Sequence, residues 1–198
     1  QQGIALLNVY LPQADPKLNA ERDELIEMIG DWIQEMKKKD YMILIMGDLN
    51  CAWAEGDRNT GQLNEGDKYI KPKIEGWGLI DVWNLRRDQR YEETGVKTKM
   101  LDAHTHHRPG NPLKKIKPSS SRIDYCLCCD KMKPFIKGIR VDKVKRVASD
   151  HRILIVDIDN NAWGMMAEKT REWEGDEQGG SIHKRLNIRG WTTETWGT

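Results

Sequence analysis

Long apolar runs are missing from this sequence of 198 residues. None approaches the roughly 18 consecutive apolar residues that a membrane-spanning helix needs, so no membrane partner is expected. The N-terminus also lacks the basic region, apolar core and small-residue cleavage site of a secretory signal. With 38% hydrophobic and 32% charged residues, the composition predicts a globular domain with a polar surface.

Cysteine is sparse, with four residues in the chain. Cys126 and Cys129 form one C-x-x-C pattern, but no second pair accompanies it, as a structural zinc site would require. The segment around Cys128 also has the pattern of a strand, in which neighbouring side chains point to opposite faces. We therefore expect these residues and Cys51 to be reduced thiols of an intracellular protein.

Charge of one sign does not dominate, because the formal net charge is only +1. The chain is therefore not a polycation, but its basic residues are concentrated locally. Residues 108–122 contain five basic residues and no acidic one, and residues 131–152 are also basic. Such stretches are usually solvated faces, whereas a basic surface beside a catalytic cleft would favour a polyanionic substrate.

The pattern of apolar residues predicts strands and one clear amphipathic helix. Residues 4–10 form a short apolar run that is typical of a buried strand. Residues 21–38 place their apolar side chains on one helical stripe, and residues 41–46 form a second apolar run. This order indicates a mixed α/β fold. Further strands are expected over 123–129, 136–144 and 153–158, and a short helix over 71–77. Loops are expected over 54–68 and 88–120, the second with one strand near His104.

The character of the sequence changes near residue 160. Residues 161–198 contain four of the eight tryptophans, many glycines and threonines, and no sustained periodicity. We therefore predict one domain over residues 1–160, followed by a linker or poorly ordered tail over 161–198. The first residue is not Met, and the chain enters a strand almost at once, which leads us to expect an N-terminally truncated domain.

Three short motifs, each at one end of a predicted strand, carry polar residues suited to chemistry. They are Gly-Asp-Leu-Asn at residues 47–50, Ser-Arg-Ile-Asp-Tyr at 121–125 and Ser-Asp-His at 149–151. An aspartate after a strand is common in α/β proteins, and a lone Ser-Asp-His occurs by chance. The three motifs together, in this order, are a much more specific signal than any one of them.

Each motif alone has an ordinary structural explanation. Asp48 and Asn50 could cap the turn that follows a strand. Asp124 could form an ion pair with Arg122, and His151 could be a structural histidine. The functional interpretation therefore depends on the three motifs forming one site.

In combination, the motifs resemble those of the endonuclease/exonuclease/phosphatase family, which includes base-excision endonucleases, DNase I-type nucleases and retrotransposon endonucleases. Further matches are Asn-Val-Tyr-Leu-Pro at residues 8–12, Asp-Val-Trp at 81–83 and Thr105. The resemblance covers residues 3 to about 158. It implies a four-layer α/β sandwich of the DNase I-like type that lacks its N-terminal strands.

The resemblance also implies roles in phosphodiester hydrolysis, in which water attacks phosphorus in line with the departing oxygen. Asp48 would be the general base, and Asn50 would orient water or phosphate. Tyr10 would donate its hydroxyl to the phosphate. His151 would contact the phosphate as an imidazolium, in a position fixed by Asp124.

Asp150 is the metal ligand that the resemblance implies, for Mg²⁺ or Mn²⁺, because its carboxylate is a hard oxygen donor. Further candidates for substrate contact are Arg122, Arg58 and Trp53. The implied substrate is nucleic acid, with DNA the first choice. Asp-Arg at residues 57–58 is similar to a pair in retrotransposon endonucleases, although it is also an ordinary surface ion pair.

Three neighbouring histidines offer a separate metal hypothesis. His104, His106 and His107 lie in a predicted loop. No carboxylate or cysteine lies at ligand spacing from them in the sequence, so this hypothesis is the weaker one.

The sequence departs from the family in one respect that bears on activity. Intact members have a catalytic Asn and a metal-binding Glu before the strand that corresponds to residues 4–10. Without that Glu, Asp150 would hold Mg²⁺ weakly.

We expect a metal-dependent endonuclease from a retroelement, impaired by truncation and nuclear in location. A missing N-terminal segment or a reverse-transcriptase domain of the same polyprotein would be its partner. The alternatives are an inactive relic that acts as a binding module, and a phosphatase on small phosphate esters such as phosphoinositides.

Overall fold

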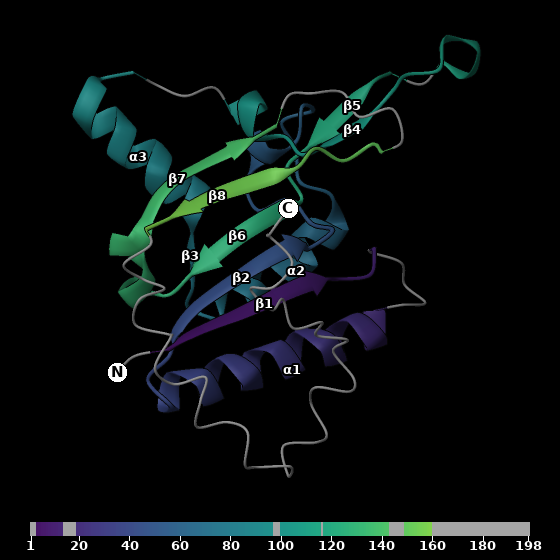
Figure 1. The fold of residues 1–198 in the computed structure, drawn as a ribbon. Coiled ribbons are helices and arrows are strands. Elements are labelled where there is room, and N and C mark those ends of the chain that lie inside the picture. The colour runs from purple at the N-terminus through teal and green to yellow at the C-terminus, as the bar shows by residue number, and fades with distance from the viewer. Residues whose placement is uncertain (1–2, 14–18, 97–99, 116, 143–148, 160–198) are drawn as a thin grey trace, which may run out of the picture.

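The computed structural model describes residues 3–13, 19–96, 100–115, 117–142 and 149–159. Within these ranges it is a mixed α/β structure, as the sequence predicts (Figure 1). All four cysteines are free and buried, which agrees with the expectation of reduced thiols. No helix among the described residues is long and apolar enough to cross a membrane.

A four-stranded sheet with the order β1-β2-β6-β3 forms the centre. β1 and β2 are parallel and joined through α1, whereas β6 is antiparallel to both of its neighbours. β2 is the apolar run of the sequence, and residues 42–45 are buried on both faces of the sheet. The elements are β1 (Ile4–Tyr10), α1 (Asn19–Lys38), β2 (Met42–Asp48), β3 (Ile80–Asp81) and β6 (Asp124–Cys128).

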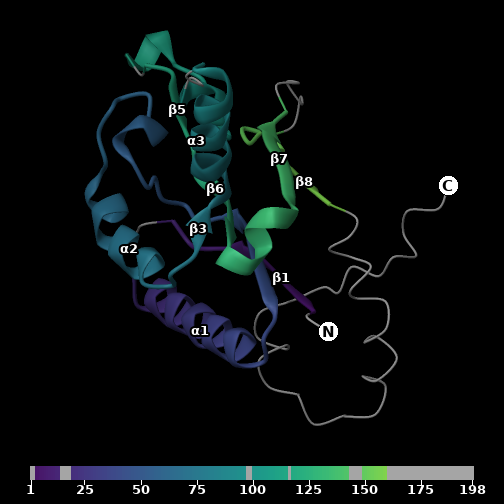
Figure 2. The same cartoon turned by 90° about the vertical axis from the view of Figure 1, so that its left-hand side faces the viewer.

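Two helices cover one face of this sheet and a smaller sheet covers the other (Figure 2). On the first face, α1 and α2 (Glu65–Glu75) bury their apolar stripes against the strands. On the second face lie the antiparallel strands β7 (Ile136–Val141) and β8 (Leu154–Ile158). α3 (Val82–Thr94) contacts β6 and β7. The result is three successive layers, helices, sheet and sheet, within the sandwich that the sequence predicts.

A two-stranded antiparallel ribbon stands apart from these layers and carries the histidine-rich segment. It pairs β4 (His106–Arg108) with β5 (Ser119–Ser121). The remaining described elements are four short 3₁₀ helices: η1 (Glu55–Asp57), η2 (Met100–Ala103), η3 (Pro112–Lys114) and η4 (Asp130–Phe135).

Two helix boundaries differ from the sequence prediction. α2 begins at Glu65, six residues before the predicted start, because Asn64 accepts the backbone N–H of Asp67 and caps the helix. α3 continues to Thr94, so the predicted loop over 88–120 is wrong at its beginning. α3 is mostly polar and ends at Gly95 in the left-handed region, with φ of 68°.

The boundary predicted near residue 160 and the tail over 161–198 lie outside the described residues. The same holds for the last part of the strand predicted over 136–144. The division into one domain and a tail therefore stays a prediction.

Candidate active site

The first two motifs and the end of β1 meet at one edge of the central sheet. Asp48, the last residue of β2, stands directly opposite Asp124, the first residue of β6. On its other side, Asp48 is the register partner of Tyr10, the last residue of β1. Directly opposed residues on neighbouring strands share a face of the sheet. The strand ends therefore gather two carboxylates and a phenol that lie far apart in the sequence.

The turn after β2 depends on backbone conformations that few residues adopt. Gly47 has φ of 142°, and a Cβ at this position would lie 1.9 Å from the carbonyl oxygen of Val9. Glycine is therefore required where β2 passes this close to β1. Asn50 is left-handed, with φ of 47°, and its backbone N–H donates to Asp48 Oδ1 over 2.8 Å. Its side-chain amide donates to the Leu11 carbonyl over 2.7 Å and ties the turn to β1.

A buried arginine on α1 supports this turn, and sequence reasoning did not identify it. The Arg22 guanidinium donates to the carbonyl oxygens of Leu49 and Asn50 over 3.1 and 3.2 Å. Burial lowers the pKa of Arg22, although nearby acidic groups oppose this. Its burial could have been predicted from the sequence, because Arg22 lies on the same helical stripe as the buried Ile26 and Ile29.

His151 of the third motif contacts residues of the first two motifs. His151 Nδ1 lies 2.9 Å from Asp124 Oδ2, and His151 Nε2 lies 4.0 Å from Asp48 Oδ2. The backbone N–H of Asp124 donates to the hydroxyl of buried Thr105 over 3.2 Å. The expected partnership of Asp124 with His151 is therefore present in the structure, and the alternative pairing with Arg122 is not.

Burial raises the pKa of Asp48 above its ordinary value of 3.8, and the neighbouring Asp124 carboxylate adds to this shift. The backbone N–H of Asn50 and the charge of His151 act in the opposite direction and offset part of it. A carboxylate whose pKa is raised is a stronger base than an ordinary aspartate. It also makes the folded protein less stable when it is charged.

Replacing Asp48 with asparagine is therefore expected to stabilise the fold at neutral pH. Asparagine keeps an oxygen that accepts the Asn50 N–H and removes a charge that burial disfavours. We expect a rise in Tm of about 2–4 °C, corresponding to about 1 kcal/mol. Because the folded-state pKa lies above the unfolded one, the difference should be present near neutral pH. It should vanish as the pH falls below 3.8, where both states are protonated.

The measurement is thermal unfolding of both proteins in EDTA, so that bound metal does not contribute. A lower Tm for the variant at neutral pH would show that the charged form of Asp48 does not destabilise the folded protein.

Arg122 is placed in the interior, and the prediction that it contacts substrate is wrong. Its side chain is buried, with Nε and one terminal nitrogen donating to Asp57 and the other terminal nitrogen donating to Asp81. The three distances are 2.8, 3.1 and 2.7 Å. Burial raises the pKa of Asp81, and Arg122 lowers it. This buried cation holds the segments before α3 and around η1 against the strand that carries Asp124.

The other two candidates for substrate contact are partly buried. Arg58 makes two hydrogen bonds, of 2.6 and 2.7 Å, to the carboxylate of Asp67. The Trp53 ring lies against Tyr125 with centroids 5.6 Å apart, and its indole N–H donates to Glu75 over 3.0 Å. Both side chains already have protein partners, so their contact with substrate stays a prediction. Tyr10, in contrast, is 67% exposed beside Asp48.

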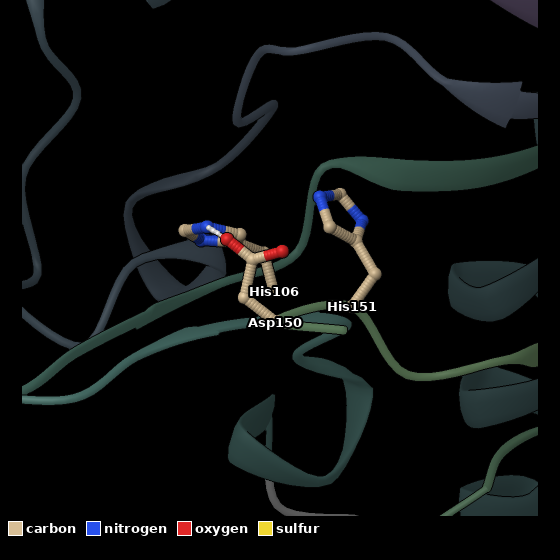
Figure 3. Close-up of side chains that lie close together, drawn as sticks. All are labelled: His106, Asp150 and His151. Carbon is tan, nitrogen blue, oxygen red and sulfur yellow. Dashed lines mark hydrogen bonds and ion pairs between the residues drawn. The ribbon is translucent and has the colours of Figure 1, made fainter. Parts of the chain in front are cut away.

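Asp150 and one of the three neighbouring histidines stand together at the exposed side of the site (Figure 3). Asp150 Oδ2 lies 3.2 Å from His106 Nε2. This corrects the expectation that the histidines lack a companion carboxylate, because the carboxylate comes from a distant segment. His104 and His107 are separate from this contact. Buried His104 bonds to Ser120 and Gly56, and His107 bonds to the His104 carbonyl.

Two overlapping groups of side chains could hold a metal ion, and His151 belongs to both. One contains His106 and Asp150, and the other contains Asp48 and Asp124. In each group the potential ligand atoms lie within 4.8 Å of one another. Burial acts to raise the pKa of Asp150, but its own backbone N–H, His106 and His151 lower it overall. Asp150 is therefore a charged carboxylate at neutral pH and fits the role of a metal ligand.

Comparison of the sequence with models of known protein families gives no match, and comparison with curated proteins gives none. Comparison with solved structures does give matches. A 3′-5′ exonuclease (NExo) from Neisseria meningitidis has a TM-score of 0.56 and 18% identity, over 79% of this chain and 62% of that one. An AP endonuclease from Archaeoglobus fulgidus has a TM-score of 0.53 and 19% identity, over 78% of this chain and 62% of that one.

A third match is the endonuclease domain of TRAS1, a telomere-specific non-LTR retrotransposon. Its TM-score is 0.51 with 19% identity, over 75% of this chain and 55% of that one. The chain thus spans less than two thirds of the length of the structures that it matches. At these identities the comparisons establish the architecture. The chain has the mixed α/β fold of the DNase I-like exonucleases and endonucleases.

Proposed function

We propose that this chain carries the hydrolytic site of a metal-dependent phosphodiesterase that acts on nucleic acid. The observation that supports this most strongly is the alignment of Asp124, His151 and Asp48. These residues come from three motifs spread over about a hundred residues, and contacts of 2.9 and 4.0 Å join them. If these three residues only stabilised the fold, nothing would require an imidazole to lie between two carboxylates where the strands end.

Each of the three side chains has a separate role in hydrolysis. Asp48 accepts a proton from the attacking water, and its raised pKa makes it suited to this task. Asp124 accepts the hydrogen of His151 Nδ1, which fixes the orientation of the ring. The ring then offers Nε2–H to a phosphate oxygen and offsets the negative charge that grows there. Asn50 has a second amide hydrogen, besides the one given to Leu11, that can be donated to phosphate.

Asp150 would hold the divalent ion, and Tyr10 would donate its exposed hydroxyl to the phosphate. When bound, such an ion supplies positive charge that stabilises the phosphate in the transition state. Asp150 is 60% exposed and charged, so it can reach an ion shared with the substrate. Mg²⁺ usually takes one or two carboxylates together with substrate phosphates. We therefore expect weak binding of Mg²⁺ before substrate arrives.

DNA is the substrate that we propose. The Neisseria protein with this fold has also been solved, as a 3′ phosphatase, bound to a product DNA hairpin. An AP endonuclease is among the other structures with the fold. A retroelement origin and a nuclear location belong to the same proposal. The TRAS1 domain comes from a retrotransposon, but its sequence identity to this chain is similar to that of the other matched structures.

Cleavage of DNA by the purified chain and by Asp48→Ala tests the proposed function. Relaxation of supercoiled plasmid and cleavage of a duplex with an abasic site are measured in Mg²⁺ and in Mn²⁺. We expect slow cleavage by the unsubstituted chain and a further loss of about 10²–10⁴-fold in the variant, because the general base is removed. The matched control is Asp130→Ala, which removes a carboxylate that is 83% exposed on η4.

Equal cleavage by the unsubstituted chain and Asp48→Ala would reject Asp48 as the base and with it the proposed site. Release of phosphate from a 3′-phosphorylated oligonucleotide or from an inositol phosphate, without cleavage of internal bonds, would favour the phosphatase alternative. Binding of the same duplex without any turnover in either metal would favour the inactive binding module.

A further inference from the structure

The exposed side of the site offers mostly nitrogen ligands, and not the oxygen ligands that a cluster of carboxylates would offer. His106, Asp150 and His151 offer two imidazole nitrogens and one carboxylate oxygen (Figure 3). His106 Nε2 and Asp150 Oδ2 are 3.2 Å apart, and the two rings meet edge to face with centroids 5.1 Å apart. Ligands at 2.0–2.1 Å from a tetrahedral ion lie about 3.4 Å from one another. The pair formed by His106 and Asp150 already has this separation.

The backbone holds the two ligand-bearing segments in register. The N–H of His107 donates to the Asp150 carbonyl over 2.8 Å, and the N–H of Arg152 donates to the Thr105 carbonyl over 2.6 Å. His106 and His151 form an antiparallel bridge between these two hydrogen bonds. The three side chains therefore project from backbone that is fixed on both sides. Small side-chain rotations are then sufficient to bring the remaining ligand atoms, now within 4.8 Å, around one ion.

The hydrogen bond of His151 to Asp124 leaves one ring nitrogen for a ligand, whereas His106 Nε2 is hydrogen-bonded to Asp150, a contact that a bound ion would replace. His151 Nδ1 bonds to Asp124, so Nε2 remains available. A carboxylate behind a coordinating histidine orients the ring and makes it a better ligand. His106 Nδ1 lies 3.5 Å from the Ser121 hydroxyl, at the outer limit of a hydrogen bond, and its Nε2 faces Asp150.

We propose that His106, Asp150 and His151 form a site for a transition-metal dication of the Co²⁺ or Zn²⁺ class. Imidazole suits Zn²⁺ and similar transition metals, whereas Mg²⁺ and Mn²⁺ are better matched by oxygen ligands. His106 is the ligand that sets this preference, because it adds a second nitrogen to the carboxylate and the histidine of the Ser-Asp-His motif. The site belongs to the protein without substrate, because the proposed function gives His151 Nε2 to the phosphate once substrate is bound. Binding of the ion is therefore measured without any substrate.

Titration of the full chain with Co²⁺, followed by visible absorption, tests the site directly. Bound Co²⁺ with nitrogen ligands at low coordination number is expected to give intense d–d bands. Zn²⁺ binding, measured by competition with Co²⁺, gives a second measure of affinity. We expect His106→Ala to weaken both ions by about 10- to 100-fold, and Asp150→Asn to do the same. A large excess of Mg²⁺ should leave the Co²⁺ spectrum unchanged.

The matched control is His107→Ala, which removes the next histidine of β4 while leaving the metal ligands in place. Circular dichroism and Tm show whether each variant is folded, and His106→Gln replaces His106→Ala if the alanine variant is not. Equal Co²⁺ affinity in the His106 and His107 variants would overturn the inference, as would displacement of Co²⁺ by an equal concentration of Mg²⁺. If that happened while Asp48→Ala still abolished cleavage, the proposed function would stand and the metal assignment alone would fail.

Discussion

Replacing His151 with alanine is expected to slow phosphodiester cleavage by about 10²–10⁴-fold, because one positioned proton donor at the phosphate is lost. The ring lies between the carboxylates of Asp124 and Asp48, at 2.9 and 4.0 Å, and no other imidazole among the described residues stands between them. Its side chain is 32% exposed, so the substitution should leave the core intact. Initial rates on the abasic duplex, measured in saturating Mn²⁺, give the comparison.

His107→Ala is the control for this substitution as well, since His107 bonds to a backbone carbonyl and not to a motif carboxylate. We expect the rate of this control to stay within a few fold of the unsubstituted chain. A His151→Ala protein that is folded and cleaves at the unsubstituted rate would remove the imidazole from the mechanism.

Replacing Arg122 with methionine is expected to lower the free energy of unfolding by about 3–5 kcal/mol, which is typical for breaking a buried ion pair. The substitution leaves the carboxylates of Asp57 and Asp81 buried without their common cation. Three hydrogen bonds between side chains are lost together. Chemical denaturation, with a constant dependence on denaturant, measures the change.

Arg140→Met provides the matched control, because Arg140 is also paired with an aspartate, Asp157, but is 59% exposed on β7. An exposed ion pair contributes about 0–1 kcal/mol, so this variant should differ little from the unsubstituted chain. Equal stability of the two variants would show that Arg122 does not organise the loops around the site.

Much of the site follows from local sequence patterns. A buried strand predicts where Asp48 lies, and the Ser-Arg-Ile-Asp motif predicts the beginning of the strand that carries Asp124. The glycine of the first motif is explained only by the structure, because its requirement arises from the nearby carbonyl of Val9. The pairing of Asp124 with His151 follows from the resemblance and not from spacing, since the two residues are joined by tertiary contact.

The parts that the sequence did not predict depend on contacts between distant segments. Arg122 lies two residues before Asp124 in the same motif, yet its partners Asp57 and Asp81 come from other elements. His106 meets Asp150 because β4 pairs with the segment that carries the third motif. Spacing along the chain contains no information about either contact.

Local signals for the misplaced helices were present in the sequence. Asn64 and Asp67 have the spacing of a capping box, and Gly95 ends α3 in a left-handed conformation. α3 was missed because its surface is mostly polar and a helix of this kind lacks a clear apolar stripe.

A double-mutant cycle on cleavage with Asp124→Asn and His151→Ala tests most directly whether these two residues act as one site. If Asp124 acts by holding His151, its substitution can do little once the ring is gone. Our expectation is that Asp124→Asn slows cleavage in the unsubstituted chain, and that the double variant cleaves within about threefold of His151→Ala alone. Multiplication of the two separate losses in the double variant would contradict it, because the two residues would then act independently and not as one site.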